Sequence, residues 1–249
     1  MDEKYTKEGI INNIKNSSKK DLYKAACVNY TGFTTDTKEK YTEVIAGHLL
    51  SNIAKYSKDI PCVTREASYR VKGHKWHAYI PGARQEERLA RSLYNQPLND
   101  VHDQTLLHIV DYQVPLKNER EGEGKESKGL GKIDLLAWDD SGYGLLILEL
   151  KKPGSSETLL RCVLEAYTYW KTVDHKKLWN DFGYKGKPRI GAAVLIFAQS
   201  QPCKDWRDEK QLQVDALRKA LGVGVYVLAG EKDLRVTKVD RGASYDYAK

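Results

Sequence analysis

The stretch GKIDLLAW (131–138), followed by DDSG (139–142) and YGLLILELK (143–151), decides the fold of this chain. The two outer pieces are apolar runs of strand length, and the four residues between them are typical of a turn. The sequence therefore predicts a β-hairpin. A turn centred between Ser141 and Gly142 pairs Asp134 directly with Glu149, with their Cβ atoms roughly 5 Å apart. A turn with one residue more or fewer would separate the two carboxylates onto opposite faces.

The second strand of this hairpin is apolar on both faces, because leucine or isoleucine fills positions 145–148 and 150. That pattern is typical of a central strand covered on both sides. Glu149 and Lys151 share one face near its end. Two carboxylates there are costly unless a cation compensates them, and oxygen ligands suit Mg²⁺, which also binds substrate phosphate. Lys151 can then hold the attacking water or stabilise charge on the phosphate. The alternative is a structural ion cluster of Asp134, Glu149 and Lys151.

This combination of a carboxylate, an apolar hairpin and a Glu-x-Lys step resembles the PD-(D/E)xK nuclease superfamily, which includes restriction enzymes, Holliday-junction resolvases and RecB-like exonucleases. The resemblance implies that Asp134 and Glu149 ligate Mg²⁺, for which Mn²⁺ can substitute, and that the Leu150 carbonyl is a further candidate ligand. It also implies that Lys151 is the catalytic lysine. Ile133 stands where the family name has proline, at a position that varies widely in the superfamily.

Apolar periodicity predicts the remaining elements. In chain order they are a helix over 83–94, strands over 105–116, 131–138 and 143–151, a helix over 157–173, a strand over 189–197, a helix near 208–221 and a strand over 224–229. This order matches the αβββαβ core of the superfamily. We therefore expect an α/β fold with a restriction endonuclease-like αβββαβ core, in which helices flank a central mixed sheet. The expected domains are residues 81–249 for this core and residues 1–80 for an N-terminal extension of helices and a β-ribbon.

Residues 1–58 are expected to be helical, with one amphipathic helix running from about Thr37 to Ile53. Residues 62–80 are predicted to form the β-ribbon, turning near Lys72 and Gly73. Its aromatic and basic side chains could contact nucleic acid by stacking and by phosphate binding. The alternative is a solvated hairpin whose aromatic side chains pack inward.

On the predicted helix over 83–94, Glu86 shares the apolar face with Leu89, Ala90 and Leu93, while Glu87 lies on the flank. Many nucleases of the superfamily carry an extra metal-site carboxylate on this helix, which makes Glu86 a candidate ligand. The alternative is that both acids only complement the helix dipole.

The helix over 157–173 carries Arg161, Glu165 and Tyr169 on one side. RecB-like nucleases have a Gln-and-Tyr motif on this helix, so Glu165 and Tyr169 are weak candidates for substrate contact, and packing is the alternative. Residues 117–132 are polar and glycine-rich, and predict a mobile loop next to Asp134. Its lysines could meet DNA phosphates, or the segment could be a plain linker.

Composition favours a polyanionic partner, because 41 Lys and Arg residues against 34 acids give a net charge of +7. No apolar run is long enough to span a membrane, and the charged N-terminus predicts no signal peptide. The four scattered cysteines are expected to be reduced thiols in a cytoplasmic protein. His74 and His77 lack a third ligand at zinc-site spacing.

Taken together, the residues predict a Mg²⁺-dependent DNA endonuclease acting on duplex or branched DNA, with RNA as a further possible substrate. A homodimer is expected if both strands are cut together. The alternatives are a RecB-like exonuclease and a catalytically silent nuclease-like module that binds nucleic acid or a protein.

Overall fold

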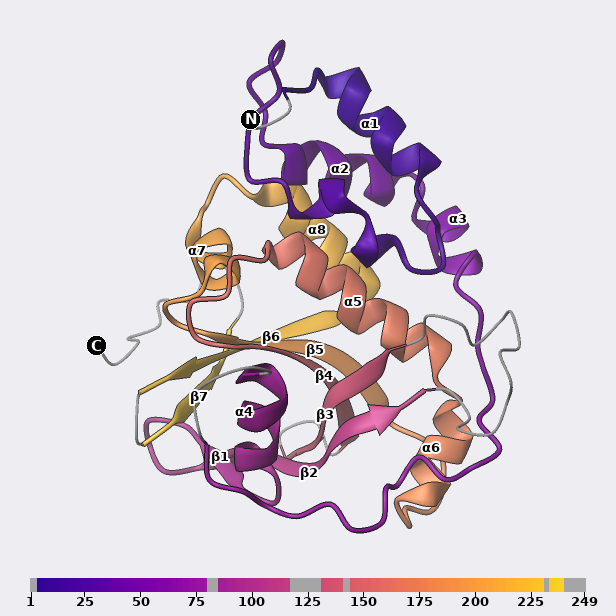
Figure 1. Cartoon of the computed structure of the whole chain (residues 1–249), viewed down its shortest axis with the longest axis vertical. Coiled ribbons are helices and arrows are strands. Elements are labelled where there is room, and N and C mark those ends of the chain that lie inside the picture. The colour runs from indigo at the N-terminus through magenta and orange to yellow at the C-terminus, as the bar shows by residue number, and fades with distance from the viewer. Residues whose placement is uncertain (1–3, 80–84, 117–130, 141–143, 231–232, 240–249) are drawn as a thin grey trace.

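The computed structural model describes residues 4–79, 85–116, 131–140, 144–230 and 233–239. Within these residues, seven strands form a closed barrel in chain order. The strands are β1 (Pro97–Asn99), β2 (Thr105–Pro115), β3 (Lys132–Asp139), β4 (Gly144–Lys151), β5 (Ile190–Phe197), β6 (Val223–Ala229) and β7 (Arg235–Lys238). The helices that accompany them are α4 (Gln85–Leu93), α5 (Leu159–Thr172), α6 (His175–Asp181), α7 (Gln201–Arg207) and α8 (Leu212–Leu221). In Figure 1, β4, β5 and β6 lie between α5 and α8 above and α4 below.

Neighbouring strands are antiparallel from β1 to β4, parallel from β4 to β6 and antiparallel between β6 and β7. Helices make the two parallel crossovers, α5 and α6 before β5, then α7 and α8 before β6. The barrel closes where Asn99 of β1 pairs in parallel with Arg235 of β7. Arg235 also donates to the Asp100 carbonyl at 3.1 Å and pairs with Asp103. These contacts hold the two ends of the sheet together.

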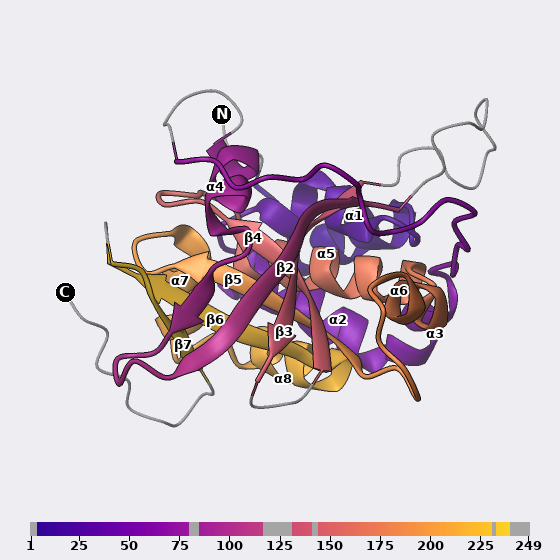
Figure 2. The ribbon, with the colours of Figure 1, turned by 90° about the horizontal axis from the view of Figure 1, so that it is seen from below.

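The predicted fold class is therefore wrong. The sheet is a closed mixed barrel and not the open sheet of a restriction endonuclease-like core. The prediction missed α6, α7 and, above all, the short strands β1 and β7, whose pairing closes the barrel. Three and four residues are too few to give a periodic signal. Pairing shifts in β1 and β2 mark irregularities of the kind that bend strands, and Figure 2 shows β2 as a long, bent strand.

Each face of the sheet has its own hydrophobic core. On one face, Leu89 and Leu93 of α4 pack with strand residues that include Leu148. On the other, α5 and α8 pack with strand residues that include Ile147 and Val194. In the part of the chain that is described, no helix combines the length and the apolar character needed to cross a membrane.

The β3–β4 hairpin forms in the predicted register. Leu135 pairs with Leu148, and Asp139 pairs with Gly144. Extending this register by one pair brings Asp134 opposite Glu149. β4 lies between β3 and β5, and all but one of its residues are buried. The prediction of a central strand covered on both faces is confirmed.

The N-terminal part is helical, as predicted. It contains α1 (Lys7–Asn16), α2 (Tyr41–Ser51), α3 (Ile53–Lys58) and two short 3₁₀ segments, η1 (Leu22–Lys24) and η2 (Ala26–Asn29). The predicted single helix ending at Ile53 is interrupted at Asn52, between α2 and α3. Ile10 and Ile14 of α1 belong to the same core as α5. Packing therefore continues across the predicted domain boundary near residue 80, and the two domains stay a prediction.

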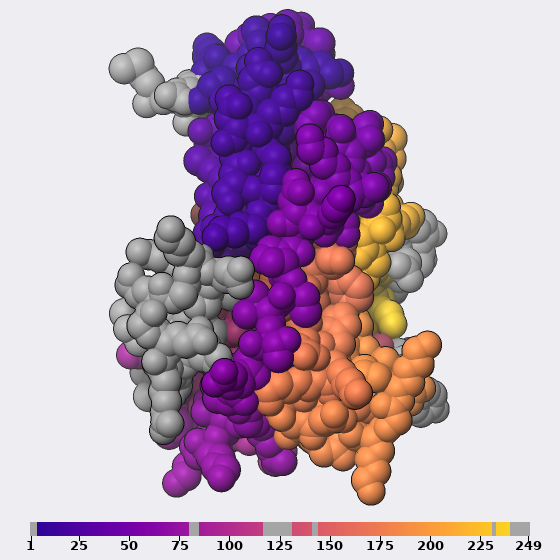
Figure 3. Space-filling view, turned by 90° about the vertical axis from the view of Figure 1, so that its right-hand side faces the viewer, coloured from indigo at the N-terminus to yellow at the C-terminus, as the bar shows by residue number. Residues whose placement is uncertain are grey.

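Residues 62–79 do not form the predicted β-ribbon, because this described segment contains only an isolated bridge and no strand. In Figure 3 it runs as a continuous band over the surface, beside the region of α6. The Tyr69 N–H donates to Asp181 Oδ2 at 2.8 Å, and His74 Nδ1 lies 2.5 Å from Asp111 Oδ1. This segment therefore bonds to α6 and β2 instead of folding back on itself as a hairpin.

Candidate active site

Asp134 lies on β3 between two other strands, opposite Gln113 of β2 and Glu149 of β4. Gln113 Nε2 donates to Asp134 Oδ1 at 3.0 Å, and the Leu150 N–H donates to Oδ2 at 3.2 Å. Gln113 has a left-handed φ of 48°, a conformation that is uncommon outside glycine and that recurs at functional sites. The Asp134 carboxylate is thus oriented from both flanking strands.

The Lys151 ammonium is buried among three carboxylates. Its Nζ lies 2.6 Å from Glu149 Oε1, 2.8 Å from Glu157 Oε2 and 3.4 Å from Glu165 Oε2. The Lys151 side chain is only 5% exposed, and an ammonium has three donors to share among these acids. We refer to Asp134, Glu149, Lys151, Glu157 and Glu165 as the acid–lysine cluster.

Helix α5 supports this cluster from one side of the sheet. The Tyr169 hydroxyl donates to Glu165 Oε1 at 3.1 Å and lies 3.3 Å from the Tyr23 hydroxyl. A Cβ at Gly131 would collide with the Tyr169 hydroxyl, which explains a glycine at the start of the predicted motif. Helical spacing predicted that Glu165 and Tyr169 share a side of the helix, and the structure brings Glu165 against Lys151.

Glu86 of α4 lies near the same strand ends. Its Oε1 accepts from the Lys152 N–H at 3.4 Å, and its charge is one of the causes that raise the pKa of Asp134. Glu87 instead pairs with Arg91 at 2.6 Å, one turn along the helix. Of the two acids, Glu86 therefore faces the carboxylate pair, as its position on the apolar face predicted.

The two central carboxyls are strongly perturbed. Burial raises the pKa of Asp134 to about 7, with Lys151 opposing and Glu165 and Glu86 adding to the rise. Burial also raises the pKa of Glu149 well above its ordinary value, helped by the charges of Asp134 and Glu165. Two desolvated carboxyls side by side favour uptake of a proton or of a cation. At neutral pH the Asp134 and Glu149 pair therefore lacks the positive charge that would balance two ionised carboxylates.

For Lys151, the effect of burial on the pKa is outweighed by the charges of its neighbours. Burial alone would lower its pKa, but the negative charge of Glu149, with those of Glu165 and Glu157, outweighs burial and raises the pKa. Lys151 therefore keeps its proton at neutral pH. It can donate hydrogen bonds and neutralise anionic charge, and it does not serve as a base.

The described residues contain no group of three or more His, Cys, Asp or Glu side chains arranged to hold a metal ion. Mg²⁺ does not require such a cage, since it is usually bound by one or two carboxylates together with water and substrate phosphate. Glu149 Oε2 is buried and lacks a hydrogen-bond partner among the described residues. Two desolvated carboxylates, one with a spare oxygen, have the chemistry that a hard cation requires. Asp134 and Glu149 therefore fit Mg²⁺, while a role for the Leu150 carbonyl stays a prediction.

Sequence reasoning missed Gln113 and the role of Glu157. The pairing shift in β2 hides the alignment of Gln113 with Asp134, and Glu157 precedes α5 without any motif of its own. Residues 117–130 of the predicted loop lie outside the described part of the chain, so the position of this loop over the site stays a prediction.

Exposure differs among the described side chains of residues 62–80 that were predicted to contact nucleic acid. Arg65 and Tyr69 are buried, at 4% and 0% exposure, and are not available to a ligand. Trp76 and Tyr79 are 52% and 39% exposed. Any contact made by this segment would therefore exclude Arg65 and Tyr69 and could use exposed residues such as Arg70, Trp76 and Tyr79.

Comparison with known proteins finds no matching family model, and no curated protein or solved structure matches the chain significantly.

Proposed function

We propose that this protein is a metal-dependent nuclease that hydrolyses phosphodiester bonds in DNA, acting as an endonuclease. The observation that carries the proposal is the carboxylate pair of the partly exposed Asp134 and the buried Glu149, aligned across β3 and β4 with Lys151 bound to Glu149 at 2.6 Å. Asp134 and Glu149 would hold Mg²⁺ or Mn²⁺, with Glu86 contributing from α4. When bound, such a cation activates water and stabilises negative charge on a phosphate.

The protein groups have distinct tasks in this proposal. Lys151 stays protonated and donates to the attacking water or to a phosphate oxygen, where its charge offsets the charge that develops in the transition state. Glu165 and Glu157 hold the ammonium beside Glu149. Gln113 orients Asp134 through its 3.0 Å hydrogen bond. Low local dielectric strengthens each of these interactions.

The proposed class of substrate is inferred from the net charge of the chain. A net charge of +7 favours association with a polyanion, and duplex or branched DNA is the proposed substrate, with RNA as the comparison. Cutting both strands at once would need two chains, so a homodimer is part of the proposal. We also propose a cytoplasmic location, because the cysteines of the described residues are free thiols.

The test is a cleavage assay with supercoiled, linear, single-stranded and branched DNA and with RNA, in Mg²⁺, in Mn²⁺ and in EDTA. Lys151→Ala is compared with Lys152→Ala, which removes the neighbouring lysine on the other side of the strand. We expect metal-dependent nicking of supercoiled DNA that Lys151→Ala abolishes and Lys152→Ala largely retains. Cleavage by neither the native protein nor any variant, or equal cleavage by all, would overturn the proposal.

Exonuclease action is the second candidate. It is favoured by the contact between Tyr169 and Glu165 at 3.1 Å, because RecB-like exonucleases carry their helix motif at this place. Degradation of linear DNA with no nicking of closed circles would select it. Binding of DNA without cleavage in either metal would select the silent nuclease-like module.

A further inference from the structure

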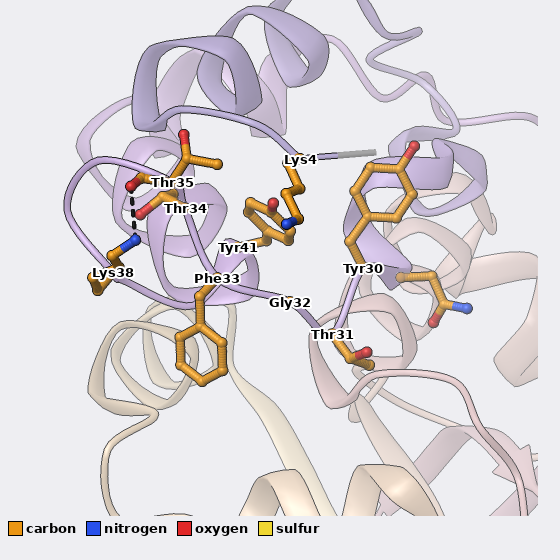
Figure 4. A pocket seen from close by; sticks show the side chains of 10 residues that line it. Lys4, Tyr30, Thr31, Gly32, Phe33, Thr34, Thr35, Lys38 and Tyr41 are labelled. Atoms are coloured by element: carbon orange, nitrogen blue, oxygen red, sulfur yellow. Dashed lines mark hydrogen bonds between the residues drawn. The ribbon is translucent and has the colours of Figure 1, made fainter. Parts of the chain in front are cut away.

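The N-terminal part of the molecule holds a cavity lined by residues 4 and 29–41, none of which belongs to a motif in the sequence. Its volume is about 770 Å³, and its lining includes Lys4, Tyr30, Phe33, Lys38 and Tyr41. Figure 4 shows these side chains around the hollow. Sites for small molecules and cofactors commonly have volumes of about 300–1,000 Å³, so this N-terminal pocket has room for a nucleotide-sized ligand.

Tyrosine rings that pack against one another form part of the wall of this pocket. Tyr30 stacks on Tyr5 with the ring planes 9° apart and 5.7 Å between centroids, and Tyr41 meets both rings edge-on. Phe33, in contrast, is 55% exposed at the pocket. An exposed phenylalanine beside a rigid aromatic wall offers a face on which a flat ring can stack.

The polar groups of the lining select for negative charge. Lys4 and Lys38 contribute two amines, and none of the described lining residues carries a carboxylate. The Lys38 amine donates to the Thr35 carbonyl at 2.9 Å, which directs it while leaving other donors for a ligand. Lys38 also has a left-handed φ of 58°, a strained conformation of the kind found at binding loops. A ligand with a flat ring and an anionic group fits this chemistry.

Hydrogen bonds connect the pocket lining to Thr158, the residue that follows Glu157 of the acid–lysine cluster. Asn29, on the pocket lining, accepts from the Thr158 N–H at 2.8 Å, and the Thr158 hydroxyl donates to the Val28 carbonyl at 2.6 Å. The residue before Thr158 is Glu157, which binds Lys151 at 2.8 Å. The pocket wall and the cluster therefore meet at the start of α5.

We infer that the N-terminal pocket binds one nucleotide of a single-stranded nucleic acid segment, with its base on Phe33 and its phosphates at Lys4 and Lys38. The inference rests on the proposed function, since it assigns the pocket to a strand that also reaches the acid–lysine cluster. A free nucleotide has the same chemistry, so the test separates the two sources.

The experiment measures binding of a labelled single-stranded DNA by fluorescence anisotropy in EDTA, where metal-dependent cleavage does not occur. Phe33→Ala is expected to raise the Kd about tenfold, the size of effect seen when one stacked base loses its ring, and Phe33→Tyr to restore it. The matched control, Leu212→Ala, removes another exposed apolar side chain and should leave the Kd unchanged.

Salt dependence tests the phosphate contacts. Combined Lys4→Ala and Lys38→Ala should reduce the slope of log K against log salt by about 1.4, since each phosphate contact with a single strand contributes about 0.7, while Lys187→Ala, at an exposed site elsewhere, should not. A Kd that Phe33→Ala leaves unchanged would overturn the inference. So would a nucleoside monophosphate that binds through Phe33 when the strand does not. Because cleavage is not measured, failure here leaves the proposed nuclease untouched, and loss of nuclease activity leaves this result untouched.

Discussion

The acid–lysine cluster is centred on buried charged side chains, whereas the lining of the N-terminal pocket includes an exposed aromatic ring and lysine amines. In the cluster, Glu149 and Lys151 are buried charges at 3% and 5% side-chain exposure, and each perturbs the pKa of the other. In the pocket, Phe33 is an exposed ring and the amines line an open wall. Burial makes charge interactions strong, whereas exposure leaves rings available for stacking. The proposed chemistry and the proposed strand binding therefore fall in two neighbouring parts of the molecule.

The largest expected effect separates two acids that bind the same lysine. Glu149→Gln should lower the cleavage rate by a factor on the order of 10³, because it removes a proposed cation ligand. Glu157→Gln should lower it less than tenfold, because Glu157 only helps to hold Lys151. Cleavage rates on supercoiled DNA in Mg²⁺ give both numbers. Equal losses in the two variants would mean that Glu149 is merely another partner of the lysine.

Removing the buried ammonium should cost stability in a pH-dependent way. Lys151→Ala leaves its carboxylates uncompensated, and we expect a loss of about 3–5 kcal/mol in the free energy of unfolding at pH 8. At pH 5 the loss should shrink, because the acids can take up protons. Urea unfolding at both pH values measures it. Arg218→Ala is the control, since its partner Asp215 keeps Lys219 and should give a loss independent of pH.

A further effect is expected from Asp134 alone. Its pKa is raised to about 7 by burial, so the folded protein holds a proton there that the unfolded chain releases above its ordinary pKa. Stability from this group is therefore present at low pH and is lost as the pH rises from about 4 to about 7. In EDTA, the unfolding free energy of the native protein should fall relative to Asp134→Asn by about 4 kcal/mol over this range. If the unfolding free energies of the native protein and of Asp134→Asn changed with pH in the same way, the pKa of Asp134 would not be raised in the folded protein.

The smallest effect concerns the packing behind the cluster. Gly131→Ala should push the Tyr169 hydroxyl away from Glu165, with an expected cost of about 1–3 kcal/mol in stability. Cleavage should fall severalfold without any change in binding to the N-terminal pocket. Gly73→Ala, at an open position with nothing near its Cβ, controls for the loss of a glycine, although its positive φ adds a small strain of its own. A fall in DNA binding in EDTA would argue that the two regions are not separate.

Local signals predicted the centre of the molecule. Alternation, turn residues and the apolar run of β4 determined the hairpin register, and this register alone aligns Asp134 with Glu149. Helical spacing placed Glu86 on the inner face of α4 and Glu165 beside Tyr169. In each case the deciding interactions are close in sequence or follow from a strict period.

The features that were missed depend on contacts between distant segments. Closure through Asn99 and Arg235 needs two strands too short to show a period, and Gln113 reaches Asp134 only because the pairing of β2 shifts. The alternating aromatic residues after position 62 looked like a ribbon, but Tyr69 is buried against other elements. Alternation reports that side chains are packed, without saying what they pack against.

Cation binding tests whether Asp134 and Glu149 form a metal site. Titration of the protein with Mn²⁺ at pH 8, followed by electron paramagnetic resonance of the free ion, measures it without any nucleic acid. We expect one bound Mn²⁺ per chain, weaker binding at pH 6 because Asp134 takes up a proton, and loss of binding in Glu149→Gln but not in Glu157→Gln. No bound Mn²⁺ in the native protein, or equal binding in Glu149→Gln, would contradict the account.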